Sequence, residues 1–131
     1  MLGSNTYLGL TVNEEVCQAA HDALEHYGTG CSGSRFLNGT LDLHIELEKQ
    51  LADFVGKEAA MTTSTGYQTN LAAIASLVGP HDYAICDIEN HASIYDACKM
   101  SYGKMLRYKH SDMEDLERKL QKVPELSLIH I

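Results

Sequence analysis

Short apolar runs alternate with helical patterns along most of this chain, and this alternation constrains the fold more than any other feature. The candidate strands span 59–63, which is an apolar and β-branched run, 83–86 and 104–108. Helical patterns with apolar residues at three- and four-residue spacing span 67–78, 92–101 and 112–123. Strands that alternate with helices favour a mostly parallel sheet with helices on its faces. We therefore expect an α/β fold, with a sheet that three strands leave unfinished.

Two more helices are expected before the first candidate strand. Asn13 can cap a helix that Gly28 ends, and Thr40 can cap a second helix that ends at Gly56. The second helix has an apolar stripe that we expect to be buried: Leu43, Leu47, Leu51 and Phe54. The segment 28–39 between the helices holds four glycines, which predicts a loop. Its mixture of glycines with Arg35 and Phe36 is too specific for a flexible linker.

Composition excludes several classes of function. Ten basic and eighteen acidic residues give a formal net charge of −8, so the chain lacks the basic surface that nucleic acids and anionic lipids require. The four cysteines form no CxxC pair, which disfavours zinc-ribbon and redox motifs. No apolar stretch approaches the roughly 18 residues of a membrane helix, and no secretory leader pattern is present. We expect a cytoplasmic protein.

The turn from the first candidate strand into the helix at 67–78 has the composition of an anion site. It reads Ser64-Thr65-Gly66-Tyr67. A helix start offers unpaired N–H groups and the positive end of the helix dipole. Gly66 lets a phosphate approach the backbone, and either hydroxyl can donate a hydrogen bond. A strand-to-helix turn made of small residues is also common without any ligand, so both interpretations stay open here.

His91 follows the second candidate strand, so it should lie at the same sheet edge, because ligands of open α/β sheets bind at the carboxyl ends of strands. An imidazole there can stack on a flat cofactor or exchange a proton with a substrate. A single histidine is more often a surface or capping residue. The two segments support each other because they follow adjacent strands.

Other catalytic patterns are weak. His44 and Glu48 are one helical turn apart, but exposed helix faces produce such pairs by chance, and His21 and His26 are poorly spaced for a shared metal. No Gly-x-Ser-x-Gly sequence occurs, so a serine hydrolase is not indicated. We predict no metal site.

The two ends of the chain look cut. Residues 126–131 match the translation of a transposon-end sequencing adapter, and we exclude them from the fold prediction as a non-native segment. The alternative is a native apolar strand after Pro124.

Five motifs, in order, resemble the α-oxoamine synthases, a family of fold-type I enzymes that use pyridoxal 5'-phosphate (PLP). The matching segments are 3–10, 28–48, 64–71, 90–94 and 110–116, which cover nearly all of the chain up to Pro124. The resemblance implies a truncated aspartate aminotransferase-like large domain. Residues 1–40 would form an N-terminal segment with a glycine-rich interface loop, and 41–125 the start of the PLP-binding large domain.

The resemblance also implies roles for five residues. Gly66 and Tyr67 match the pair whose amides hold the cofactor phosphate. His91 matches the histidine that stacks on the pyridine ring and helps to orient and deprotonate the bound amino acid. Asn5 and Ser34 match positions on the substrate side of the site, and the family's site lies between the two subunits of a homodimer.

The implied reaction is a decarboxylative condensation of an amino acid with an acyl-CoA. The segment 30–40 is most similar to the bacterial serine palmitoyltransferase branch, which implies L-serine and a long-chain acyl-CoA as substrates and a place in sphingolipid synthesis. Glycine C-acetyltransferase and 8-amino-7-oxononanoate synthase activities are the enzymatic alternatives, and a non-catalytic module that only binds or dimerises is the other. The family's Schiff-base lysine has no match in this chain, so we expect an N-terminal fragment that is inactive alone.

Overall fold

The computed structural model describes residues 3–123 and 128–130 and divides the chain into two compact units, Met1–Ala60 and Met61–Ile131. In the described parts of the chain, no helix combines the length and apolar character of a membrane-spanning segment.

The first unit contains the short 3-10 helix η1 (Leu10–Val12) and the helices α1 (Glu14–Tyr27) and α2 (Asp42–Val55). The side chain of Asn13 accepts a hydrogen bond from the Val16 amide at 3.1 Å, so the predicted cap of α1 is confirmed. Gly28 ends α1 with a φ of 79°, and Gly56 ends α2 in the left-handed conformation, as predicted.

The predicted cap of α2 is wrong. Thr40 donates its hydroxyl to the Arg35 carbonyl at 2.6 Å and accepts from the Arg35 side chain, so it is not available to the helix. Leu41 is the N-cap residue instead, and its amide donates to Nδ1 of His44 at 3.0 Å. Arg35 also forms a bidentate ion pair with Glu48 of α2, with both N–O distances at 3.0 Å. These contacts fasten the glycine-rich loop to α2.

The predicted burial of the α2 stripe is also wrong for this chain. Its four members are 39–88% exposed, with Leu51 at the low end and Phe54 at the high end. Ala52 is the one described residue of α2 that is buried. Helical periodicity identifies an apolar face but not the surface that covers it, and no described part of the chain covers this one.

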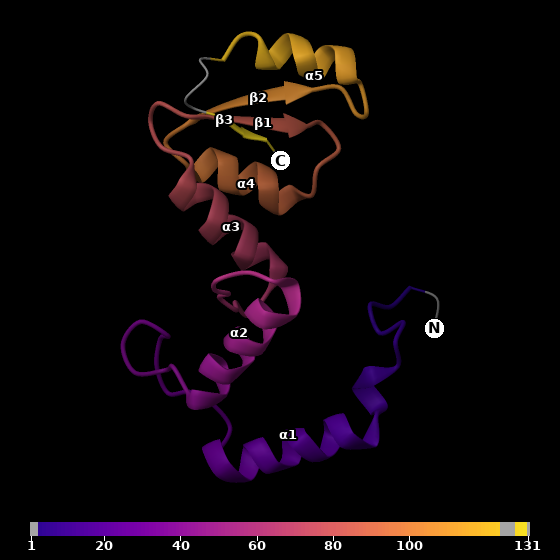
Figure 1. The fold of residues 1–131 in the computed structure, drawn as a ribbon, viewed down its shortest axis with the longest axis vertical. Helices are drawn as coiled ribbons and strands as arrows, with labels where there is room; N and C mark the ends of the chain where they lie inside the picture. Colours follow the sequence, from indigo (N-terminus) through magenta and orange to yellow (C-terminus); the bar gives the residue numbers. More distant parts are fainter. Residues whose placement is uncertain (1–2, 124–127, 131) are drawn as a thin grey trace. The chain divides into compact units, whose positions relative to one another are not determined.

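The second unit is an α/β structure. It contains α3 (Gly66–Leu77), β1 (Tyr83–Asp87), α4 (Ala92–Met100), β2 (Lys104–Tyr108), α5 (Met113–Leu120) and β3 (Leu128–His130). The strands form a parallel sheet in the order β2-β1-β3, with Tyr83 opposite Lys104 and Leu128. Figure 1 shows α4 and α5 on opposite faces of this sheet. The expected parallel α/β architecture is confirmed.

Two segments differ from the sequence predictions in their strand structure. Residues 59–63 are not a strand, because no described strand pairs with them and a β conformation depends on such pairing. Residues 128–130 pair with β1 through backbone hydrogen bonds, which any sequence can make. The origin of 126–131 as a non-native segment therefore stays a prediction, and residues 126, 127 and 131 lie outside the described residues.

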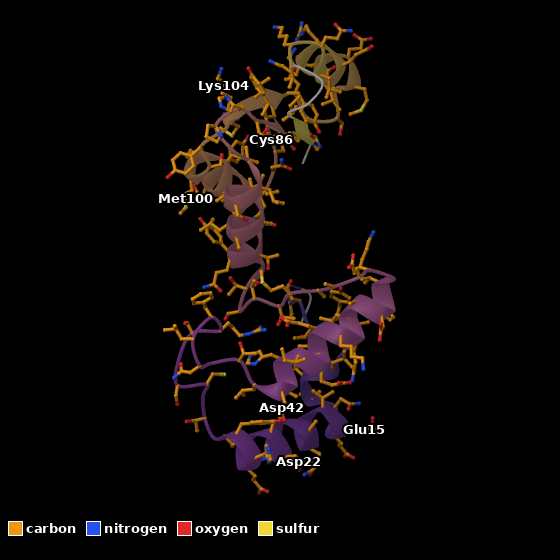
Figure 2. The ribbon with its side chains drawn as sticks, turned by 60° about the vertical axis from the view of Figure 1, so that its left-hand side comes forward. Glu15, Asp22, Asp42, Cys86, Met100 and Lys104 are labelled. Carbon is orange, nitrogen blue, oxygen red and sulfur yellow. The ribbon has the colours of Figure 1, made fainter. Side chains whose placement is uncertain are left out.

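The core of the second unit lies between β1, α3 and α4. Its buried members are Ile74, Val78, Ala84, Cys86, Ala97 and Cys98. Figure 2 shows Cys86 on the strand at the centre of the sheet and Lys104 at the start of β2. The thiols of Cys86 and Cys98 are 3.5 Å apart, and burial raises the pKa of the Cys86 thiol to about 12. This core fixes the first turns of α3 and α4 on one scaffold.

Candidate functional site at the start of two helices

The first turn of α3 presents two unsatisfied amides. Thr65 caps the helix by accepting the Gln68 amide at Oγ1 (3.1 Å), and its carbonyl accepts the Thr69 amide at 3.0 Å. The amides of Gly66 and Tyr67 have no hydrogen-bond partner among the described residues. A Cβ atom at Gly66 would meet nothing within 4 Å, so the space beside these amides is open. The turn therefore fits a phosphate group.

Tyr67 ties this turn to the neighbouring helix. Its phenol donates a hydrogen bond to the carboxylate of Asp96 in α4, and this bond raises the pKa of Tyr67. The Tyr67 side chain is thereby directed toward α4, while its amide faces the open end of α3.

His91 is the N-cap residue of α4. Its Nδ1 atom lies 3.2 Å from the Ser93 amide and 2.7 Å from the Ser93 hydroxyl. The imidazole is otherwise exposed, so its outer edge and its faces are accessible. The capping role that we considered as an alternative is present, and it leaves Nε2 free to face a ligand.

The structure brings the two predicted segments together. The side-chain amide of Asn70 in α3 donates to the Ser93 hydroxyl of α4 at 2.8 Å, and the Tyr67–Asp96 bond makes a second link between the same two helices. Gly66, Tyr67 and His91 therefore belong to neighbouring first turns that are joined by side chains. A planar ligand with an anionic group fits this arrangement. The two amides can donate hydrogen bonds to the anion, and the exposed imidazole can stack on the planar part.

A further cluster joins the ends of β1 and β2, and the sequence prediction missed it. The carboxylate of Asp87 accepts hydrogen bonds from the Glu89 amide (2.8 Å), His110 Nδ1 (3.0 Å) and the Ser111 amide (3.3 Å). The Glu89 amide and then His110 lower the pKa of Asp87, and Asp87 raises the pKa of His110. Asp87 and His110 are 23 residues apart, so only the strand pairing could reveal their contact.

Asn5 and Ser34 both lie in the first unit, and both are exposed. The Ser34 carbonyl accepts the amides of Leu37, Asn38 and Gly39, which gives the loop its turn. The assignment of Asn5 and Ser34 to the substrate side of the site stays a prediction. Within the described residues, no three His, Cys, Asp or Glu side chains are grouped closely enough to hold a metal ion.

Comparison with known proteins places these features in a family. The family model for aminotransferase class I and II matches residues 1–130. A serine palmitoyltransferase from Sphingobacterium spiritivorum is 54% identical over 127 residues, which are 97% of this chain and 32% of that protein. A putative 8-amino-7-oxononanoate synthase 2 from Mycobacterium tuberculosis is 52% identical over 122 residues, which are 93% of this chain and 16% of that protein.

A solved structure agrees in backbone as well. The serine palmitoyltransferase of Sphingomonas paucimobilis, solved with a bound PLP–myriocin aldimine, superposes with a TM-score of 0.91 at 42% identity. The match covers 95% of this chain and 32% of that structure. The chain thus spans about a third of the length of the serine palmitoyltransferases that it matches.

Proposed function

We propose that the full-length protein condenses L-serine with a long-chain acyl-CoA. The premise is that this chain belongs to the aminotransferase class I and II family, in which it is the N-terminal part of an α-oxoamine synthase. The observation that carries the proposal is the junction of the α3 and α4 first turns, with the free amides of Gly66 and Tyr67 beside the exposed ring of His91.

The residues present fit PLP, which supplies the electron sink for the carbanion formed at the amino-acid Cα. In this proposal the amides of Gly66 and Tyr67 bind the phosphate at the positive end of α3. The His91 ring would stack on the bound cofactor and exclude water there, and its Nε2 atom would face the amino acid. Asn5 and Ser34 are assigned to the substrate side from the family resemblance alone.

The choice of serine rests on the similarity of the whole chain to serine palmitoyltransferases and on the resemblance of the segment 30–40 to that branch. The mycobacterial relative has a similar identity, so 8-amino-7-oxononanoate synthesis is the second candidate. Phe36 of the glycine-rich loop is 94% exposed, and such an exposed apolar side chain supports a homodimer with the site near the subunit interface. The cytoplasm is the proposed location.

The substrate proposal is tested on purified full-length protein loaded with PLP. CoA release is measured with L-serine, glycine or L-alanine, each paired with palmitoyl-CoA, acetyl-CoA or pimeloyl-CoA. We expect the highest kcat/KM for L-serine with palmitoyl-CoA. A preference for another pair would transfer the protein to a different branch of the family, and no turnover with any pair would reject the condensation itself.

A further inference from the structure

Ser93 is a fully buried polar residue with two side-chain partners. Its relative exposure is 0%, and a buried hydroxyl is costly unless it is hydrogen-bonded. Its Oγ atom lies 2.8 Å from Nδ2 of Asn70 and 2.7 Å from Nδ1 of His91. The hydroxyl therefore connects α3 to the exposed imidazole.

The donor and acceptor properties of these three groups determine which group donates in each hydrogen bond. The Asn70 side-chain nitrogen can only donate, so Ser93 Oγ accepts from it and has its own hydrogen left for His91. The Ser93 amide, 3.2 Å from Nδ1, can also only donate. Two donors thus point at Nδ1, so this nitrogen acts as the acceptor and carries no proton. The ring proton is then on Nε2, the nitrogen that the cap leaves outward.

We propose that Asn70 and Ser93 are positioning residues that hold His91 in the Nε2–H tautomer and fix the plane of its ring. The proposal deepens the proposed function, since it gives the stacking residue a defined orientation and a defined proton before any ligand binds. The hydrogen bonds that pass through the buried Ser93 hydroxyl achieve this at little entropic cost, because α3 and α4, which carry Asn70 and Ser93, pack against each other.

The first experiment reads the tautomer and does not depend on activity. Full-length protein without cofactor is labelled with 15N-histidine, and the nitrogen shifts of His91 are compared in the wild type, Ser93→Ala and Asn70→Asp. We expect unprotonated Nδ1 in the wild type. Asn70→Asp turns the Ser93 hydroxyl toward the new carboxylate, so Nδ1–H should become populated, and Ser93→Ala should give a mixture of tautomers.

The second experiment asks whether Ser93 acts through His91. Ser93→Ala should lower kcat about tenfold with little change in the KM for acyl-CoA, because a misoriented ring weakens positioning more than substrate binding. In a His91→Ala background the same change should have no further effect on kcat. Ser101→Ala is the control, since its hydroxyl donates to the Cys98 carbonyl at the other end of α4 and has no other partner in the described part of the chain.

An Nδ1–H tautomer in the wild type, or unchanged nitrogen shifts in both variants, overturns the proposal. Equal losses of kcat in the two backgrounds overturn it as well, and circular dichroism of each variant identifies any loss that comes from misfolding. If the wild type shows the Nε2–H tautomer but no condensation activity, the proposed function fails while the orientation of His91 stands.

Discussion

Asp87 lies where the ends of β1 and β2 meet. It faces His110 Nδ1 at 3.0 Å, and Glu89 lies 3.7 Å from His110 Nε2. The phenol of Tyr95 in α4 donates to the Ile88 carbonyl of the same loop at 3.0 Å. The loop that leads into His91 is therefore held by side chains from α4 and from the segment after β2.

The Asp87–His110 pair should make stability depend on pH. The pKa of His110 is raised in the folded protein, so its contribution is complete below the unfolded value of about 6.5 and is lost as pH rises through the folded pKa. The pKa of Asp87 is lowered, so its contribution is present above about 3.8 and is lost as pH falls through the folded pKa. The pair is therefore most stabilising in mildly acid solution.

We expect His110→Gln to destabilise the full-length protein more at about pH 5.5 than at about pH 9. Chemical unfolding at the two pH values measures this difference. NMR titration should give His110 a pKa above that of an unfolded histidine, and Asp87→Asn should bring it down. A pH-independent loss of stability in His110→Gln would contradict the ionic account.

Caps were the residue-level features that the sequence predicted best. Asn13 caps α1 as expected, and Asp112, the first residue of the helical pattern at 112–123, caps α5, because each side chain accepts a hydrogen bond from the amide three residues ahead. Thr40 failed because its hydroxyl is occupied by Arg35 of the glycine-rich loop. The Asp87–His110 contact was not predictable, because local patterns do not report which strand ends are adjacent.

At the scale of elements, the glycine-rich loop depends on the Arg35–Glu48 pair. The Glu48 side chain is 13% exposed, and the planar guanidinium binds both of its carboxylate oxygens. A lysine at this position keeps the positive charge but cannot make the bidentate contact. Arg35→Lys should therefore speed amide hydrogen exchange in 28–40 of the full-length protein, while Lys49→Arg, on an exposed turn of α2, should not. Wild-type exchange in Arg35→Lys would show that the loop is held by other contacts.

The turn between α4 and β2 needs glycine for space. A Cβ atom at Gly103 would collide with Val78 and would lie 2.9 Å from the carbonyl oxygens of Asp82 and Gly79. Gly103→Ala should lower the free energy of unfolding by about 1–3 kcal/mol, because the backbone has to move. Gly30→Ala, where a Cβ meets nothing within 4 Å, is the matched control. Equal effects of the two substitutions would refute the steric explanation.

Helices and paired strands differed in how well the sequence predicted them. The helices follow local spacing and end at glycines or near the expected residues. The strands predicted at 83–86 and 104–108 are confirmed, and they pair with each other within this chain. The run at 59–63 is also short, with apolar and β-branched residues, but it has no partner among the described strands. Strand formation is a property of pairs, which composition alone does not contain.

At the scale of the whole molecule, the chain corresponds to about a third of the serine palmitoyltransferases that it matches. This explains why the apolar stripe of α2 was correctly identified as apolar but wrongly expected to be buried. The family and its α/β fold were predictable from five ordered motifs. The amino-acid substrate was not, because relatives with different names share similar identity with this chain.

The chain as given should not form the covalent lysine adduct with PLP. The family that the chain resembles has a Schiff-base lysine, and this lysine has no match here. Lys57, Lys99 and Lys104 fall in no matching motif. Incubation with PLP, borohydride reduction and peptide mapping should show no stoichiometric adduct in the 131-residue chain and one modified lysine in the full-length protein. A stoichiometric adduct on any lysine of the short chain would contradict the expectation.

The central claim is that two helix starts hold one planar, phosphorylated ligand. It is tested most directly by hydrogen exchange of the cofactor-free full-length protein, with added PLP compared with added pyridoxal, which lacks the phosphate. PLP should protect the amides of Gly66 and Tyr67 and the segment 90–94, whereas pyridoxal should protect 90–94 alone. Protection of Gly66 and Tyr67 by neither ligand, or equally by both, would contradict the account.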